Sequence, residues 1–178
     1  IDNVAGQIQA QKNISLNADT INNAGTASHI IAGEKLTANA SKVMNAQTKD
    51  SNILGGLHAK NIEINAGELD NQSGVIRASE NATLNINNQL SNQLGSITSL
   101  NRLNIGTADK TLDLNNTDGE LLAKNQLNLK VNKLVNKGKI ISEGNVDIDL
   151  KQSYTHTQAD QIAANGILKL STEQDLIN

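Results

Sequence analysis

Apolar and polar residues alternate along most of this chain, and the alternation returns at regular intervals. In one clear case, Ile97-x-Ser99 is followed, after three residues, by Leu103-x-Ile105. A period of two is typical of a β-strand that buries one of its faces. The pattern therefore predicts many short strands joined by tight bends.

The alternation divides the chain into repeating units. Each unit starts with a large side chain, and in most units an Asn follows two positions later. The starts are Ile1, Ile21, Val43, Leu69, Leu90, Leu112, Leu134 and Tyr154, and a further unit opens at Leu176. The units are 20–26 residues long, a period that is typical of solenoid proteins.

Within a unit, two short strands precede a third strand near the next start. The inward positions follow the pattern of Leu121-x-Ala123-x-x-x-Leu127-x-Leu129 in most units. The sequence thus predicts an all-β protein, a parallel β-helix of about eight coils that extends over residues 1–178. A leucine-rich repeat has a similar period, but its convex side needs helical patterning, and here the alternation continues around the whole unit.

The composition supports stacked strands and excludes several other classes of protein. Asn accounts for 27 of the 178 residues, and Tyr154 is the only aromatic residue. An Asn-rich chain can be disordered, but disorder does not require apolar residues in fixed register. The net charge of −3 gives no basic footprint for nucleic acid. No apolar run reaches the roughly 18 residues of a membrane-spanning helix.

The third position of the units predicts a structural ladder of amides. In register, each side-chain amide can donate to one neighbour and accept from the other, which satisfies groups that are costly to bury. Asn also tolerates the left-handed conformation that bends require. Leu114 and His156 are expected to interrupt this ladder. Its predicted members are Asn3, Asn23, Asn45, Asn71, Asn92 and Asn136.

Two stretches carry a family resemblance: LDNQSGVIRASENATLNIN from Leu69 and IDNVAGQIQAQKNISLNAD from Ile1. They resemble the haemagglutinin repeats of filamentous haemagglutinin-like exoproteins, which include adhesins and the CdiA toxins of contact-dependent growth inhibition. The resemblance extends over essentially all 178 residues. It implies a right-handed β-helix within a long filament on the surface of a Gram-negative bacterium. It also implies an outer-membrane transporter of the two-partner type as the partner during secretion.

This resemblance leads to two functional hypotheses. In the first, the segment is a structural shaft that extends and presents an adhesive or toxic tip. In the second, it binds a receptor or glycan on a neighbouring cell. A β-helical polysaccharide lyase or hydrolase is disfavoured, because sugar-processing sites usually contain aromatic stacking platforms. Both ends are in register and uncapped, so we expect further coils in both directions.

The sequence predicts no catalytic, cofactor-binding or metal-binding residues. There is no Cys, and His29 and His58 lack a nearby cluster of carboxylates. Asp147 and Asp149 alternate with a buried residue and should lie beside lysines of adjacent coils, as ordinary surface charge pairs. Six lysines could touch an anionic glycan, although their usual role would be to prevent sideways aggregation. These are Lys124, Lys130, Lys133, Lys137, Lys139 and Lys151.

The best candidate contact sites are irregularities in the repeat, because loops that leave a solenoid often carry binding. The third unit is the longest, so its extra residues should leave the coil as a loop. A second irregularity is GTADKT, from Gly106 to Thr111. The predicted contact loop contains Gln47, Thr48, Lys49, Asp50, Ser51 and Asn52.

Overall fold

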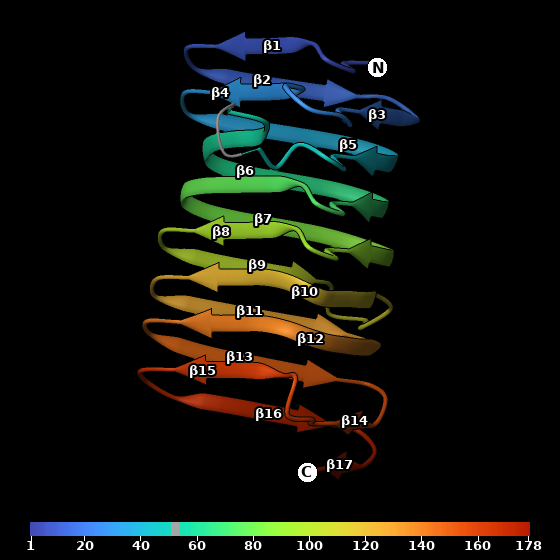
Figure 1. Ribbon diagram of the computed structural model, residues 1–178, viewed down its shortest axis with the longest axis vertical. Helices are drawn as coiled ribbons and strands as arrows, with labels where there is room; N and C mark the ends of the chain where they lie inside the picture. The colour runs from blue at the N-terminus through green and yellow to red at the C-terminus, as the bar shows by residue number, and fades with distance from the viewer. Residues whose placement is uncertain (51–53) are drawn as a thin grey trace.

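The chain forms a parallel β-helix, as predicted. The computed structural model describes residues 1–50 and 54–178, and within them it contains strands and no helix. Every strand pair is parallel, and about eight coils stack along one axis with the two termini at opposite ends (Figure 1). No helix in the described part of the chain is long and apolar enough to cross a membrane.

Each coil contributes three strand segments, which stack into three faces. Longer strands such as β6 (Gly56–Asp70) and β7 (Val75–Ser91) run across all three faces in turn. The first face contains β1 (Gln7–Ala10), β4 (His29–Ala32), β8 (Ser96–Ser99), the ends of β10 (Asp113–Ala123) and β12 (Lys133–Ser142), and β15 (Gln161–Ala164).

The other two faces follow the same order. The second face contains β2 (Asn13–Asn17), the start of β5 (Lys35–Met44), β9 (Arg102–Gly106), β11 (Gln126–Val131), β13 (Asn145–Leu150) and β16 (Leu168–Thr172). The third face contains β3 (Thr20–Asn22), the end of β5, the starts of β10 and β12, β14 (Tyr154–Thr155) and β17 (Leu176–Ile177).

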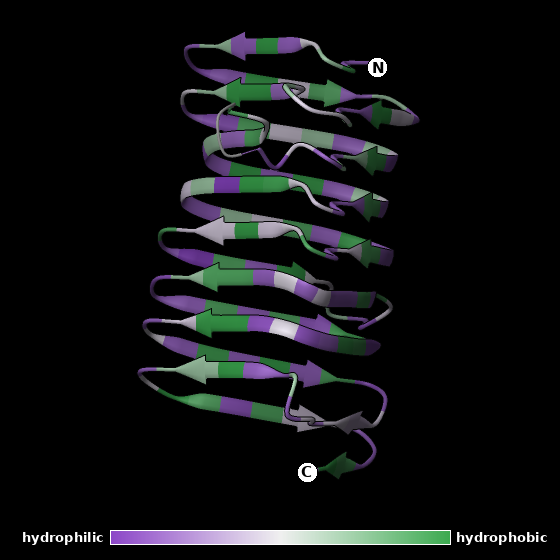
Figure 2. Ribbon diagram, viewed as in Figure 1, coloured by the Kyte–Doolittle hydropathy of each residue, from purple (hydrophilic) through white to green (hydrophobic). Residues whose placement is uncertain are grey.

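The core consists of aliphatic columns that run along the axis. On the first face, paired register joins equivalent inward residues of successive coils, and hydrophobic and hydrophilic residues alternate along the strands (Figure 2). This column contains Ile8, Ile30, Leu57, Ile76, Ile97, Leu121, Ile140 and Ile162. Its inner members are 0–1% exposed. Stacking therefore excludes water from this column in the middle coils.

The structure adds an inward column between the second and third faces that the sequence pattern did not reveal. Ala66 pairs with Ile86, and Val131 pairs with Leu150, with their side chains in the core. By alternation alone, Leu84 and Ile86 could be the inward pair of the second face in the fourth unit. The register instead aligns Ala82 with Leu103, so that unit keeps the usual spacing.

The sixth coil starts two residues later than predicted. Leu114 pairs with both Leu90 and Leu134, so it occupies the starting column. Leu112 is fully buried and belongs to the added inward column, since its carbonyl accepts a hydrogen bond from the amide of Asn132. Leu112 and Leu114 both point inward before Asn116, and the alternation alone could not show which of them starts the coil.

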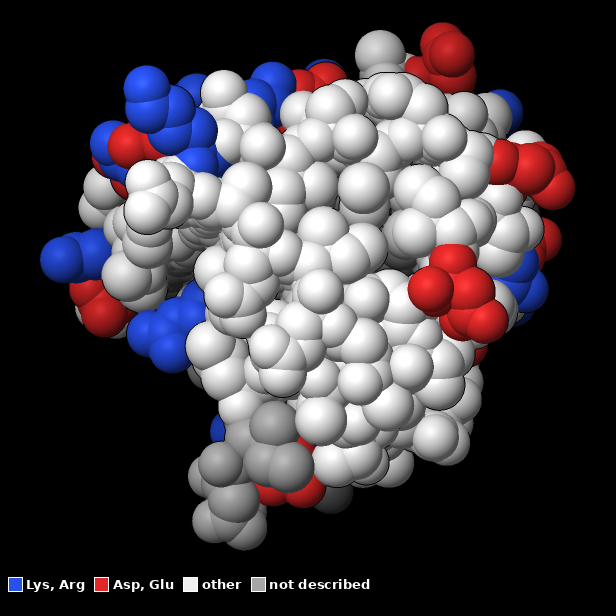
Figure 3. All heavy atoms as spheres, turned by 90° about the horizontal axis from the view of Figure 1, so that it is seen from above, with Lys and Arg blue, Asp and Glu red and all other residues white. Residues whose placement is uncertain are grey.

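Charged side chains are kept away from the stacking axis. Seen from the N-terminal end, Lys, Arg, Asp and Glu side chains lie around the rim, and the centre of the end face is uncharged (Figure 3). Several of them pair between coils, as in Lys35–Glu63 at 2.6 Å and Lys139–Glu120 at 2.9 Å. Because these pairs are exposed, each contributes little to stability.

Candidate functional site

The six predicted ladder residues all lie at the bend between the third and first faces. From Asn3 to Asn116, the Nδ2 of each ladder residue donates to the Oδ1 of the next Asn along the axis, at 2.7–2.8 Å. Asn116 stands between Asn92 and Asn136, so the interruption expected at Leu114 was wrong. The amides are 0–7% exposed, and the hydrogen bonds between them offset the cost of burying them.

The bends contain a left-handed residue, but it is not the Asn. Positive φ occurs two positions after the ladder residue, as at Ser73 (φ 51°), Leu94 (φ 57°) and Asp118 (φ 54°). A glycine follows at Gly95, where a Cβ would lie 2.2 Å from the carbonyl oxygen of Asn71. The Asn side chain therefore fastens the bend while a neighbour adopts the strained conformation.

The ladder ends at Asn136, where the stacking of the third face is broken. Strand β14 pairs with β17 and not with β12. Within the described residues, Asn136 Nδ2, Tyr154 Oη and Asp160 Oδ1 are buried without hydrogen-bond partners. Burial, with the charge of Asp160 nearby, raises the pKa of Tyr154. His156 follows the break, as predicted, and its Nδ1 lies 3.8 Å from Asp160 Oδ2.

The two histidines of the second and third coils make local contacts. His29 Nε2 lies 2.8 Å from Gln9 Nε2, and His58 Nε2 lies 2.7 Å from the carbonyl oxygen of Gly55. His29 is 7% exposed, so it is a buried residue and not a solvated one. Burial lowers the pKa of His58, the hydrogen bond to the carbonyl of Gly55 opposes this shift, and the positive charge of Arg77 adds to it. In the described ranges, no three His, Cys, Asp or Glu side chains cluster as a metal site would require.

The predicted contact loop begins later than expected. The amides of Gln47 and Lys49 donate to the carbonyls of Gln72 and Ser73 in the next coil. Thr48 is fully buried, and its hydroxyl accepts a hydrogen bond from the amide of Val75. These three residues therefore belong to the bend and not to a loop that leaves the coil.

The remaining members of that loop are less informative. Asp50 lies on the exposed side of the chain. Ser51 and Asn52 lie outside the residues that the structure describes.

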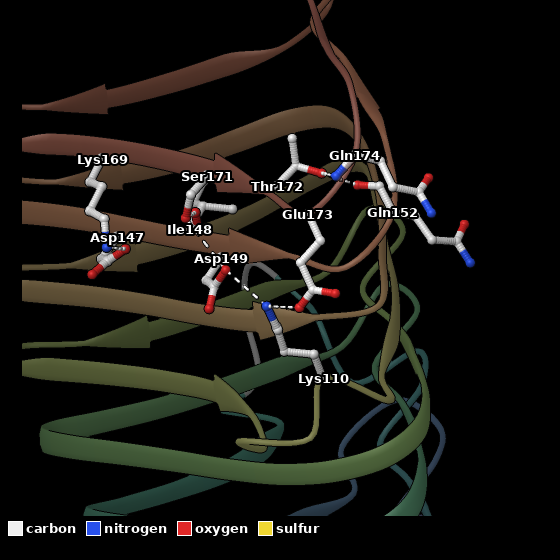
Figure 4. Close-up of polar contacts among 10 residues, drawn as sticks. All are labelled: Lys110, Asp147, Ile148, Asp149, Gln152, Lys169, Ser171, Thr172, Glu173 and Gln174. Atoms are coloured by element: carbon white, nitrogen blue, oxygen red, sulfur yellow. Dashed lines mark hydrogen bonds and ion pairs between the residues drawn. The ribbon is translucent and has the colours of Figure 1, made fainter.

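The second irregularity, Gly106–Thr111, lies across the outside of the second face. From this excursion Lys110 extends over the coils that follow (Figure 4). Its Nζ lies 3.1 Å from Asp149 Oδ1 and 2.5 Å from Glu173 Oε1, and only 14% of its side chain is exposed. Hydrogen bonds to these two carboxylates raise the pKa of Lys110. Asp149 was expected beside Lys130, and it does lie beside it in register, but its ion pair is with Lys110.

A groove of about 660 Å³ opens between the excursion and the second face. Asn104, Asn128, Asp147 and Lys169 are successive outward residues along its floor. Lys169 Nζ lies 3.7 Å from Asp147 Oδ1, as the expected charge pairing suggested. In the part of the chain that is described, this Oδ1 is buried and makes no hydrogen bond. The groove is thus lined by amides, hydroxyls and opposite charges rather than by a catalytic cluster.

The chain is similar to three proteins named CdiA. It is 20% identical over 172 residues to the tRNA nuclease CdiA of Yersinia mollaretii. The aligned region covers 97% of this chain and 5% of that relative. It is 34% identical over 116 residues to the toxin CdiA of Yersinia pestis, covering 65% of this chain and 3% of the relative. It is 25% identical over 191 residues to the deoxyribonuclease CdiA of Dickeya dadantii, covering 97% of this chain and 5% of the relative.

These similarities are distant and concern a small part of each relative. The chain spans only 3–5% of the length of the three proteins. No family model and no solved structure matches it. The β-helix together with the three matches fits a segment of a CdiA-type protein, while the assignment to a haemagglutinin repeat stays a prediction.

Proposed function

We propose that this chain is a length of shaft in a secreted, cell-surface exoprotein of the CdiA type. In this role it extends the protein from the bacterium and presents a functional tip that lies elsewhere in the parent chain. The segment itself is proposed to be non-catalytic and to need no cofactor. Its only required partner would be the outer-membrane transporter through which the unfolded chain is secreted.

The observation that carries the proposal is the continuous axial register of about eight coils. Each coil adds about 4.8 Å to the length, so the segment contributes about 38 Å of rod. The excursion Gly106–Thr111 lies on the outside of this rod and does not interrupt the core. A repeated unit that adds length at constant cross-section suits a spacer. The similarity to CdiA proteins, of which the chain spans a few per cent, supports a place within a long chain.

Cell binding by the purified segment tests the proposal. Folded protein, and a variant lacking residues 50–53, which keeps the bend residues Gln47, Thr48 and Lys49, are incubated with intact bacterial and epithelial cells, and bound protein is quantified. A shaft should show no saturable binding in either form. Saturable binding that is lost on deletion would instead make the segment a receptor-binding module with its site in the third coil, and would contradict a purely structural role.

A second test addresses length directly. One coil, residues 71–91, is deleted in frame or duplicated within the parent exoprotein. The surface filament should shorten or lengthen by about 4.8 Å for each coil while the activity of the tip is retained. Loss of that activity on replacement of this segment by coils of another β-helix, with the filament intact, would overturn the shaft assignment.

A further inference from the structure

The groove beside the excursion does not result from the stacking of the coils. A shaft needs only inward columns and bends, and coils two to four show no comparable excursion from the second face. The groove exists because Gly106–Thr111 leaves the regular path and forms a wall over the floor of the second face. Lys110 holds this wall in place through Asp149 and Glu173.

The floor of the groove interrupts an outer row of amides. In the earlier coils, Asn39, Asn65 and Asn85 each donate to the preceding Asn at 2.6–2.8 Å. Gly106 follows Ile105 just as Asn85 follows Leu84, and Ile105 pairs with Leu84. The glycine is required there, because a Cβ would lie 1.9 Å from the carbonyl oxygen of Lys130 at a φ of +90°. The row therefore stops, and Asn85 presents its acceptor Oδ1 to an open space.

A second row of outward residues, which contains Asn104 and Asn128, supplies a donor beside the acceptor of Asn85. Asn128 Nδ2 donates to Asn104 Oδ1 at 2.7 Å, which directs Asn104 Nδ2 toward Thr83 on the preceding coil. Thr83, Asn85 and Asn104 all line the groove. Donors and acceptors thus lie side by side along the floor without completing a ladder.

The charges in the groove balance. Lys130 and Lys169 line it together with Asp147 and Asp149, so the four lining charges sum to zero. Behind them, Lys110 faces both Asp149 and Glu173. A strongly charged ligand would meet groups of its own sign, whereas a neutral ligand rich in hydroxyls could both donate and accept.

We propose that this groove binds a neutral oligosaccharide. Side-chain amides and carboxylates offer neighbouring donor and acceptor atoms, which match adjacent hydroxyl groups on a sugar ring. The volume is within the range of roughly 300–1,000 Å³ that small-molecule sites occupy. The sole aromatic ring, Tyr154, is buried inside the coil, so no stacking platform adds affinity. The dissociation constant is expected to be about 1 mM.

The test is a titration of ¹⁵N-labelled protein followed by NMR. The probes are maltohexaose, cellohexaose and chitohexaose, with oligogalacturonate and oligosialate as acidic probes. At least one neutral oligosaccharide should shift the amide resonances of Gly106, Thr107 and Asn128 in a saturable way. The acidic probes should bind at least tenfold more weakly than that neutral oligosaccharide, so their shifts should not saturate over the same concentration range.

Three variants locate the binding. Asn104→Ala/Asn128→Ala should abolish the shifts by removing groove amides. Asn17→Ala/Asn39→Ala is the matched control, since it removes two amides of the same face that do not line the groove. Ala108→Trp should also abolish the shifts, because this exposed wall residue lines the groove and its replacement fills the space without changing the floor. Well-dispersed spectra verify folding in each case.

Several results would overturn the proposal. They are a lack of groove shifts with every neutral oligosaccharide, binding of acidic probes alone, or shifts that survive both Ala108→Trp and the double groove variant. The proposal goes beyond the shaft role, because a spacer can carry a sugar site. Its failure would therefore leave the length test and the cell-binding test of the shaft unaffected.

Discussion

At the scale of single residues, the buried amides hold the bends together. Asn92 accepts from Asn71, donates to Asn116 and also reaches the carbonyl oxygen of Glu120 at 3.2 Å. Each of these groups is buried, so it cannot turn to water if its partner is removed. The ladder is therefore sensitive to the loss of one member.

Asn92→Ala should lower the free energy of unfolding by about 3 kcal/mol, because it leaves at least two buried polar groups without partners at about 1–3 kcal/mol each. Urea denaturation followed by circular dichroism measures the change. Asn39→Ala is the control: it removes two similar hydrogen bonds from a partly exposed row and should cost less than about 1 kcal/mol. Equal losses in the two variants would contradict the importance of burial.

His58 gives the protein a pH dependence. Burial lowers the pKa of His58 below the ordinary histidine value of about 6.5. Between the folded pKa and 6.5, the unfolded state binds more protons than the folded state, so stability rises with pH across this window. The contribution of His58 is fully present above pH 6.5 and is lost as the pH falls through the folded pKa. Urea midpoints of His58→Gln should therefore fall less than those of the unaltered protein between pH 7.5 and acidic pH.

At the scale of elements, most bends combine an Asn, a left-handed residue and a close approach of backbones. The sequence indicated the bends and the Asn column, because both recur with the period of the coil. It could not place the positive φ, since Ser73, Leu94 and Asp118 share no side-chain property. It also failed at Leu112 and Ile86, because alternation gives the parity of an inward residue but not the column to which it belongs.

Leu94 is a suitable place to test the conformation of the bend. It has a φ of 57° and is 52% exposed. Its backbone conformation therefore costs free energy, and the burial of its side chain offsets little of that cost. Leu94→Asn should raise the free energy of unfolding by about 0.5–1 kcal/mol, because Asn visits the left-handed region more readily. Leu100→Asn, an exposed leucine that is absent from the positive-φ positions, should bring no such gain. A loss of stability in Leu94→Asn would show that the leucine side chain matters more than its backbone.

The groove shows what the sequence could and could not predict about a site. GTADKT was recognised as an irregularity because it broke the period. The contact of Lys110 with Asp149 and Glu173 was not predictable, because it joins residues two and three coils apart. Asp149 and Lys130 were matched by register alone, and the excursion supplied a closer partner.

At the scale of the whole molecule, burial follows the number of neighbouring coils. Ile76 and Leu127, inward residues of the middle coils, are fully buried, whereas Leu168 in the last coil is 47% exposed. A coil cannot bury enough apolar surface alone, so its stability depends on those stacked against it.

Hydrogen exchange should therefore be slowest in the middle of the rod. Amides of β7, β9 and β11 are expected to exchange near the rate set by global unfolding, and those of β1 and β16 orders of magnitude faster through local opening. Native-state exchange monitored by mass spectrometry resolves these segments. Uniform protection along the chain would show that the coils unfold as one cooperative unit.

The ladder also gives the rod a dipole along its axis. All six amide hydrogen bonds point the same way, with the Nδ2 of each Asn directed toward the following coil. Their dipoles add along the axis as peptide dipoles do in a helix. The row begins with the acceptor of Asn3 and ends with the unmatched donor of Asn136. A coil inserted into the row must therefore present an acceptor to the Asn before it and a donor to the Asn after it, so the row fixes the direction in which coils can be added.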